Sequence, residues 1–273
     1  MWERLQQFII LLNGGHLWYL GEVVSNPWPP LVFGGVLLLT VFTSTRKHSG
    51  SPGLQSTLFP FIVPGLVVLF SVATVSALWV THYAILMPWP AVAVSAAGWR
   101  LVRQARRPEP ARLLLALAVG LVVLTNGVSG WRYHRSLAVS GGLSTHSDAI
   151  YKLSQWLGQN AAGTVVAMDW GLSAPVTYLT GGQVTPVEIF GYDWQPRQTL
   201  VDQLQPFVHQ PETLYLWRAP DEIIFDRSAE FKALYRPLGL EEDIAAAFYE
   251  RSGRPLLGVT RLVPKGQAVN PPK

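Results

Sequence analysis

The chain has 273 residues, a formal net charge of +4 at neutral pH and no cysteine, which excludes disulfides, thiolate metal sites and thiol nucleophiles. All of the basic excess lies in residues 1–130, which hold eight Lys or Arg and three Asp or Glu, against thirteen and fourteen in residues 131–273. These basic residues stand in short runs between apolar stretches, so they indicate membrane topology and argue against a nucleic-acid partner.

The first 28 residues precede the long apolar segments. A cleavable signal peptide has a basic stretch, then an apolar core, then a cleavage site of small residues. The first 28 residues lack this order, so no cleavable signal peptide is predicted. Gly14-Gly15-His16 is expected to end a helix. That helix is predicted to be amphipathic and to lie along a membrane surface, because apolar residues recur at helical spacing, at Leu5, Phe8, Ile9 and Leu12.

A bundle of about four transmembrane helices is predicted over residues 29–130. A helix needs about 20 mostly apolar residues to cross the bilayer core. No Lys, Arg, Asp or Glu occurs between Thr57 and Trp99, a run that soluble proteins rarely tolerate. Core helices of a soluble protein are the alternative, but two such helices in tandem exceed an ordinary core. The expected spans are 30–44, 58–80, 83–101 and 113–128.

The orientation of the spans follows from loop charge, because Lys and Arg in short loops stay in the cytoplasm. Arg46-Lys47 follows the first span, and five arginines, from Arg100 to Arg112, lie at the end of the third span and before the fourth. Residues 1–28, the turn at His82 and everything after Trp131 are therefore expected outside the cytoplasm. No earlier span is present to carry residues 1–28 across, so we expect the C-terminal part of a longer multi-pass protein of the inner or plasma membrane. An interfacial aromatic belt is predicted at Trp79, Trp89, Trp99, Trp131 and Tyr133.

After Gly141-Gly142 the pattern changes to alternating helices and strands, which predicts an extracytoplasmic α/β domain over residues 131–273. Its sheet is expected to be mostly parallel with an antiparallel edge. Ser147 or Asp148 is the expected cap of the first helix. The helices are predicted at 148–159, 173–179, 197–208 and 226–235, the strands at 164–168, 183–190 and 213–217, and a closing hairpin at 246–250 and 257–263.

Asp169, Trp170 and Gly171 directly follow the first predicted strand, and ligands of such sheets bind at the carboxyl ends of the strands. They are the candidate site of this domain. The alternative is that Asp169 caps the next helix and Gly171 eases the turn. Arg227 and Arg254 are expected to be solvated. No GxGxxG, P-loop, GxSxG or HExxH pattern occurs, so nucleotide binding, serine hydrolysis and zinc proteolysis have no support.

Three motifs carry a resemblance to a known family: THYAILMP at 81–88, DAIY at 148–151 and DWGL at 169–172. With paired spans and an external α/β domain, the chain resembles the C-terminal portion of bacterial GT-C type membrane glycosyltransferases. That group includes protein O-mannosyltransferase-like and aminoarabinose-transferase-like enzymes. The resemblance implies transfer of a sugar from a polyprenyl-phosphate carrier to a glycan, lipid or protein acceptor at the outer face of the membrane. No cofactor is evident from the residues, and the resemblance allows a divalent metal.

The resemblance also suggests site residues. In the family a basic–aromatic pair lies near the lipid-phosphate pocket, which matches His82 and Tyr83, and His16 could approach the same external cavity. The alternatives are an interfacial aromatic anchor beside a water-facing histidine, and a plain loop histidine. The family's catalytic acidic residue lies in its first external loop. That loop has no counterpart here, where only Glu3 and Glu22 could face outward before the fourth span, so the catalytic residues stay unassigned.

Two functions from other classes remain open. In the first, the spans only anchor an external module without catalytic activity that binds glycan, peptidoglycan or a partner protein. The second, a transporter, has less support, because the spans are expected to carry no buried ionisable residues that would mark an ion path.

Overall fold

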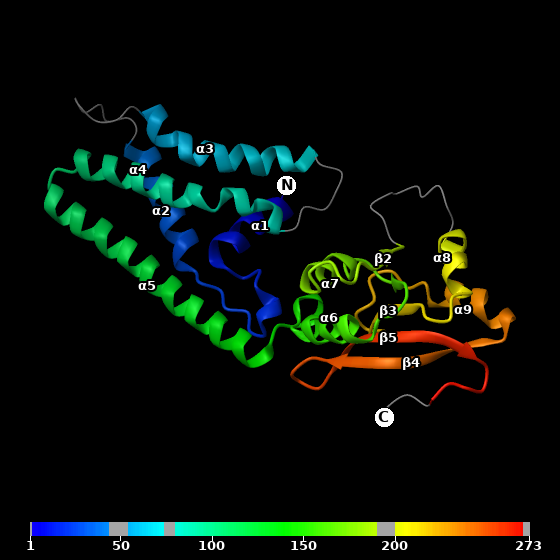
Figure 1. Cartoon of the computed structure of the whole chain (residues 1–273). Coiled ribbons are helices and arrows are strands. Elements are labelled where there is room, and N and C mark those ends of the chain that lie inside the picture. The colour runs from blue at the N-terminus through cyan, green and yellow to red at the C-terminus, as the bar shows by residue number, and fades with distance from the viewer. Residues whose placement is uncertain (1, 44–53, 74–79, 190–199, 270–273) are drawn as a thin grey trace. The chain divides into compact units, whose positions relative to one another are not determined.

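The chain divides into two compact units, Met1–Ser136 and Leu137–Lys273 (Figure 1). The structure, a computed structural model, describes residues 2–43, 54–73, 80–189 and 200–269. Arg46-Lys47, Trp79 and the first residues of the helix expected at 197–208 lie outside the described residues.

The first unit is helical, as its apolar periodicity predicts. Gly14, with a φ of 78°, follows the first helix, so the expected end of that helix at the glycine pair agrees with the structure. The elements are α1 (Trp2–Asn13), η1 (Trp18–Leu20), α2 (Trp28–Thr43), α3 (Leu54–Phe70), η2 (Ser71–Ala73), η3 (Val80–Leu86), α4 (Pro88–Gln104) and α5 (Pro108–Ser140).

Two helical stretches among the described residues are long and apolar enough to cross a membrane, His82–Gln104 and Pro108–Ser140. This differs from the four spans expected, because α2 and Thr57–Ala73 are apolar but shorter. At roughly 1.5 Å per residue, the 16 residues of α2 extend over about 24 Å, less than the bilayer core of about 30 Å.

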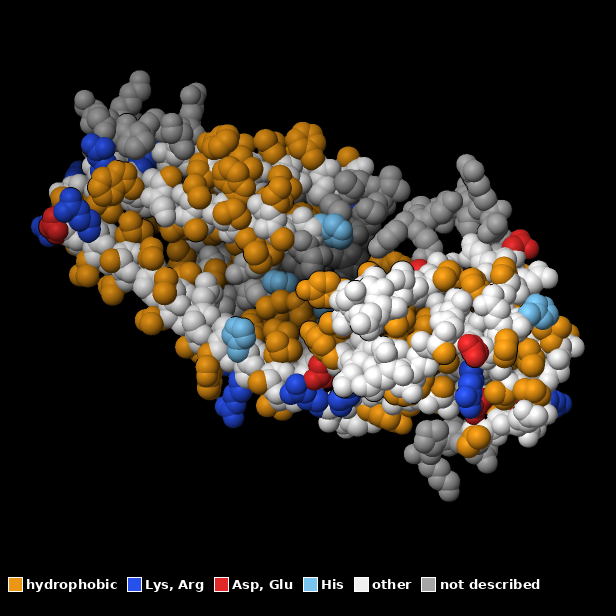
Figure 2. Space-filling model, in the orientation of Figure 1, with side chains coloured by type: hydrophobic (Ala, Val, Ile, Leu, Met, Phe, Trp, Pro, Cys, Tyr) orange, Lys and Arg blue, Asp and Glu red, His pale blue; other side chains and the backbone are white. Residues whose placement is uncertain are grey.

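Much of the apolar surface of the helical unit is exposed. None of the most apolar window of α5 is buried, and Leu124 in it is 71% exposed. Figure 2 shows hydrophobic side chains over the helices on the face turned to the viewer. Exposed apolar surface of this extent is typical of proteins that contact lipid or a partner.

Small residues allow close packing inside this unit. Val36 of α2 and Phe61 of α3 lie against Ala93 and Ala97 of α4. On the same helix, a Cβ atom at Gly98 would lie 2.7 Å from Leu115 Cδ1 of α5, so a larger residue there would require the Leu115 side chain to shift. Helices in membranes commonly approach one another through such small residues.

Polar contacts connect α5 to the segment after α1. The Tyr133 hydroxyl lies 2.6 Å from the Gly14 carbonyl oxygen and also contacts that of Val24. Asn26 Nδ2 donates to Thr125 Oγ1 at 2.9 Å and to Asn126 Oδ1 at 2.8 Å. These bonds satisfy polar groups inside an otherwise apolar helix and hold the segment in place.

The second unit is an α/β domain. Its elements are η4 (Ser144–His146), α6 (Ala149–Asn160), β1 (Val165–Ala167), α7 (Ser173–Leu179), β2 (Val187–Glu188), α8 (Leu200–Val208), β3 (Leu214–Arg218), α9 (Ser228–Tyr235), η5 (Arg236–Leu238), β4 (Leu240–Tyr249) and β5 (Pro255–Pro264). Asp148 is not a side-chain cap of α6. Its carboxylate pairs with Arg251 at 2.8 Å, while Ser147 Oγ accepts from the Ala149 N–H.

The five strands form a mixed sheet in the order β2-β1-β3-β5-β4. The first three are parallel, and β5 is antiparallel to both β3 and β4. The expected antiparallel edge is present, but the sheet is mixed rather than mostly parallel, since the two antiparallel strands have ten residues each while β1 has three and β2 has two.

β4 begins six residues before the expected strand, in a segment whose first residues are acidic. Charged residues are depleted in strands, yet the strand begins at Leu240 rather than at 246. Asp243 is tolerated there because Arg261 of the neighbouring strand lies 2.9 Å away, and Glu242 accepts from the Tyr235 hydroxyl at 2.7 Å.

Helices cover both faces of the sheet. Val165 and Ala167 of β1 pack against α6 and α7, whereas Val166 and its neighbour Met168 pack against α8 and α9. Alternate residues of a strand point to opposite faces, so β1 is apolar on every residue. This arrangement leaves the carboxyl ends of the parallel strands as the edge where polar loops meet.

Candidate functional site

The candidate site lies at the carboxyl edge of the sheet, between β1 and β3. From β1 the chain moves outward through α7 to β2 and then returns through α8 to β3 on the other side of β1. Ligands of open α/β sheets bind where the strand order reverses in this way. Asp169 follows β1 and Arg218 ends β3, so the two residues occupy this reversal point.

Asp169 is buried, and protein groups occupy both of its carboxylate oxygens. Oδ2 lies 3.2 Å from Arg218 Nε and accepts the Ile224 backbone N–H at 2.9 Å. Oδ1 accepts the backbone N–H groups of Trp170 at 2.9 Å and Phe225 at 3.0 Å. Asp169 does not cap α7, whose first turn receives no side-chain cap bond. Its role in the fold is to join the loop after β1 to the loop after β3.

Arg218 is also buried and lies among acidic groups. One guanidinium nitrogen donates to the Trp170 carbonyl at 3.1 Å. Burial lowers the pKa of Arg218, while the charges of Asp169, Glu222 and Glu188 oppose that shift. Arg218 therefore balances the negative charge at the strand ends.

The other two members of the predicted site lie beside this pair. The Gly171 N–H donates to Glu188 Oε1 at 2.8 Å, and Gly171 has a φ of 78°, a conformation that glycine adopts at little cost. Trp170 is partly exposed. The structure thus brings Asp169, Trp170 and Gly171 together with Arg218 and Glu188, two residues that sequence reasoning missed.

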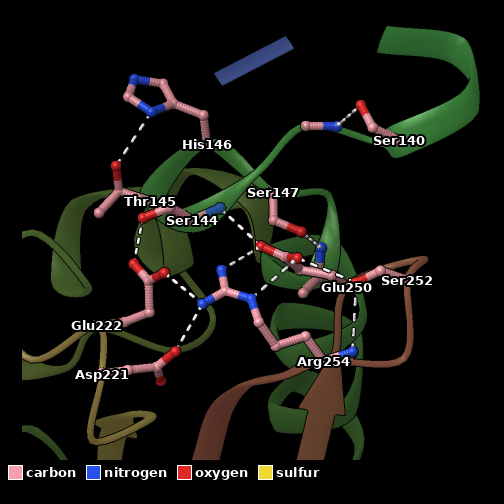
Figure 3. A network of polar contacts seen from close by, with 12 residues as sticks. Ser140, Ser144, Thr145, His146, Ser147, Asp221, Glu222, Glu250, Ser252 and Arg254 are labelled. Atoms are coloured by element: carbon pink, nitrogen blue, oxygen red, sulfur yellow. Dashed lines mark hydrogen bonds and ion pairs between the residues drawn. The ribbon is translucent and has the colours of Figure 1, made fainter. Parts of the chain in front are cut away.

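A second polar cluster at the same edge is centred on Arg254 (Figure 3). Its guanidinium lies 2.9 Å from Asp221, 2.6 Å from Glu222 and 2.6 Å from Glu250. Ser144 completes the cluster, because its N–H donates to Glu250 at 2.8 Å and its hydroxyl bonds to Glu222. Arg254, which was expected to be solvated, is thus partly exposed and bonded to three carboxylates.

Strand register explains the Arg254 cluster. Arg218 pairs with Leu257, so the antiparallel β5 begins where β3 ends, and the turn between β4 and β5 lies at the carboxyl edge. Arg254 hydrogen-bonds with Glu250 and lowers the pKa of that carboxyl below its ordinary value of 4.5. The same bonds raise the pKa of Arg254. Arg227, by contrast, is half exposed and bonds to Glu230 in its own helical turn.

His146 lies in the loop that leads into α6. Its Nδ1 lies 3.0 Å from Thr145 Oγ1. Burial, and secondly the charge of Arg218, lower the pKa of His146 below its ordinary value of 6.5, which favours the neutral ring at physiological pH. Sequence reasoning did not single out His146, because no local pattern relates it to Arg218.

The candidate site of the first unit consists of His16, His82 and Tyr83. Tyr83 is 1% exposed, and its hydroxyl lies 2.9 Å from Ser71 Oγ, so its ring belongs to the core of this unit. His82 of η3 is exposed. The Nδ1 atom of His16 is buried without a hydrogen-bond partner, and burial lowers the pKa of His16.

The helix that precedes His16 packs against the element that holds His82 and Tyr83. Phe8 and Leu11 of α1 lie in one apolar cluster with Tyr83 and Leu86 of η3. His16 follows α1 by three residues. The packing shown is thus between η3 and the helix that ends three residues before His16.

The two acidic residues expected to face outward, Glu22 and Glu3, are both on the surface of the first unit. Glu22 forms an ion pair with Arg132, and both side chains are about half exposed. Glu3 is an exposed residue in the first turn of α1. Within the described segments, no three His, Asp or Glu side chains gather as metal ligands do.

No protein-family model, curated protein or solved structure matches the chain. Its function is therefore inferred from the residues and their geometry.

Proposed function

We propose that the chain is part of a polytopic membrane glycosyltransferase that transfers a sugar from a polyprenyl-phosphate donor to an acceptor at the outer face of the membrane. The observation that carries this proposal is the packing of α1 against η3, which places the helix before His16 beside the segment that holds His82. These two histidines would bind the phosphate of the donor.

The chemistry of the two histidines suits an anionic lipid headgroup. A buried ring nitrogen without a partner is costly unless a ligand or water bonds to it, and His16 Nδ1 is such an atom. Because burial lowers its pKa, His16 would act as a neutral hydrogen-bonding group. The exposed His82 would supply a second ring N–H.

A multi-pass topology belongs to the same proposal. The two longest apolar stretches would cross the membrane with α2 and α3 beside them, and α5 would leave the membrane outward. The Arg-rich connection between α4 and α5 would then lie in the cytoplasm and the α/β unit outside.

The test is transfer of labelled sugar by membranes that contain the full-length protein. Donors would be polyprenyl phosphates that carry labelled mannose or aminoarabinose. His16→Ala and His82→Ala should each reduce transfer by roughly 10- to 100-fold, the value of a hydrogen bond to a charged group. His209→Ala changes an exposed histidine of the other unit and serves as the matched control.

Two results would count against this function. Absence of transfer by the wild-type protein with every donor would refute the transferase. Transfer that is unchanged in both histidine variants would refute their assignment to the lipid phosphate.

The second candidate is the membrane-anchored external module without catalytic activity. It is favoured by one observation, namely that Asp169, Glu222 and Glu250 of the α/β unit are all bonded to arginines or backbone N–H groups. Carboxylates held in this way are poorly suited to act as acid or base. Binding of purified peptidoglycan or glycan by the full chain, together with a lack of sugar transfer, would support this candidate.

A further inference from the structure

We propose that a groove on the outer face of α9, here called the α9 groove, binds a phosphomonoester, the doubly charged phosphate group of a small organic ligand. The groove has a volume of about 550 Å³ and is lined by Ala229, Lys232, Ala233, Arg236 and Pro237. Pockets for small ligands commonly have volumes of about 300–1,000 Å³. The proposal concerns the α/β unit by itself and requires neither sugar transfer nor a particular membrane topology.

The sequence of α9 gives this helix two different faces. Phe231 and Tyr235 are buried and belong to the core cluster that also contains residues of α8. Arg236 follows α9 and keeps a helical backbone, with a φ of −61° and a ψ of −42°. The groove residues 229, 232, 233 and 236 therefore have the spacing i, i+3, i+4 and i+7, which places them on one helical face. That face is turned away from the core.

Small residues leave space beside the two basic side chains. Lys232 and Arg236 are one helical turn apart, a spacing that puts Cβ atoms roughly 5–6 Å from each other. Ala229 and Ala233 are exposed and end at their methyl groups, and Pro237 adds an apolar ring. The α9 groove thus offers two cations for an anionic group and an apolar lining for the organic part of the same ligand.

The acidic residues near α9 in the sequence are bonded to other groups. Glu230 pairs with Arg227 at 2.9 Å. Asp226 accepts a backbone N–H at 3.0 Å, and this bond, more than the charge of Lys232, lowers the pKa of Asp226. Within the described part of the chain, neither Lys232 nor Arg236 forms an ion pair with a carboxylate. The lining of the groove therefore carries two positive charges and no negative one.

Two neighbouring cations match a dianion better than a monoanion. A phosphomonoester carries a charge of about −1.5 to −2 at pH 7 and has three acceptor oxygens. Arg236, which also lies near the Tyr235 hydroxyl, can donate two parallel N–H bonds to such a group, while Lys232 supplies a point charge. A carboxylate would neutralise only one of the two cations. Charge complementarity therefore favours the phosphomonoester.

Calorimetric titration of the full chain in a maltoside detergent tests this proposal, because such a detergent contains no phosphate. The probe is phenyl phosphate, whose ring can contact the alanines and the proline of the groove. Benzenesulfonate is the comparison ligand, since it has the same ring and a tetrahedral anion with a single charge. Phenyl phosphate should bind roughly tenfold more tightly, the effect of one additional hydrogen bond between charged groups.

Three variants test the groove itself. Lys232→Gln and Arg236→Gln should each weaken the binding of phenyl phosphate by roughly tenfold. Ala233→Leu keeps both cations but fills the space beside them, so it should weaken binding by a similar factor. Lys152→Gln is the matched control, because Lys152 is an exposed lysine of α6, on the other face of the sheet. Glutamine and leucine are good helix formers, so each variant should fold.

Four outcomes would overturn the proposal. The first is a wild-type protein that does not bind millimolar phenyl phosphate, and the second is equal affinity for benzenesulfonate. The third is unchanged affinity in both Lys232→Gln and Arg236→Gln, which would mean that the two cations only stabilise the C-terminal end of α9. The fourth is binding of oligoglutamate but not of phenyl phosphate, which would indicate an acidic polypeptide as the partner. No sugar donor is present in these measurements, so their failure is distinct from failure of the proposed transferase.

Discussion

Replacing Asp169 by alanine would remove the group that joins the loops after β1 and β3. The substitution leaves the buried Arg218 without its carboxylate and three backbone N–H groups without their acceptor. Breaking a buried ion pair by removing one partner costs about 3–5 kcal/mol. Asp169→Ala should therefore strongly destabilise the α/β unit.

Arg218→Met should cost less. Asp169 would still accept three N–H bonds, so its charge would stay partly compensated, whereas Arg218 donates to a single described backbone carbonyl. We expect about 1–3 kcal/mol for Arg218→Met, the cost of buried groups left without a hydrogen bond. The double variant should destabilise by less than the sum of the two single changes, because residues in contact are energetically coupled.

A single introduced cysteine can report local unfolding of the α/β unit in the full chain. Ser154 of α6 is 2% exposed and its hydroxyl has no hydrogen-bond partner, so Ser154→Cys preserves shape and removes an unsatisfied group. Where opening precedes alkylation, the rate of labelling follows the opening equilibrium. At about 1.4 kcal/mol per factor of ten, Asp169→Ala should accelerate labelling by roughly 10²- to 10⁴-fold.

A comparison with an exposed carboxylate makes this measurement decisive. Glu212→Ala changes an exposed acidic residue of the same unit and should alter the labelling rate by little. An acceleration below tenfold for Asp169→Ala, or a larger effect of Arg218→Met, would refute the role assigned to Asp169.

One further prediction concerns the pH dependence of the α/β unit, and another concerns a hydrogen bond in the first unit. Because Arg254 keeps the pKa of Glu250 below 4.5, ionisation of Glu250 stabilises the folded unit above about pH 4.5 and this contribution is lost as pH falls below it. Hydrogen exchange of the β4–β5 hairpin, corrected for intrinsic rates, should therefore accelerate in acid. The acceleration should be smaller in the Glu250→Gln variant. An identical acid response in the wild-type protein and the variant would contradict this prediction. Tyr133→Phe leaves the Gly14 and Val24 carbonyls without the hydroxyl, at a cost of about 1–3 kcal/mol. Exchange in residues 14–26 should rise, whereas Tyr178→Phe, at a side chain 84% exposed, should leave it unchanged.

The sequence alone determined the positions of most helices. The helix expected at 173–179 coincides with α7, and the first expected helix of the domain, 148–159, differs from α6 by one residue at each end. The two longest apolar stretches were likewise evident, because helical periodicity and apolar composition are local properties. Local properties of the sequence predict local structure.

The tertiary structure decided the pairing of charges and the direction of the outer strands. Asp169 could be placed after β1 from sequence, but its contact with Arg218 depends on β3 lying next to β1. Arg254 meets Glu222 and Glu250 only because β5 runs antiparallel to β3 and begins where that strand ends. The acidic start of β4 becomes a strand because Arg261 lies opposite Asp243. Each of these outcomes depends on strand register. Register is set by packing between segments that are distant in the sequence, so no local sequence pattern predicts it.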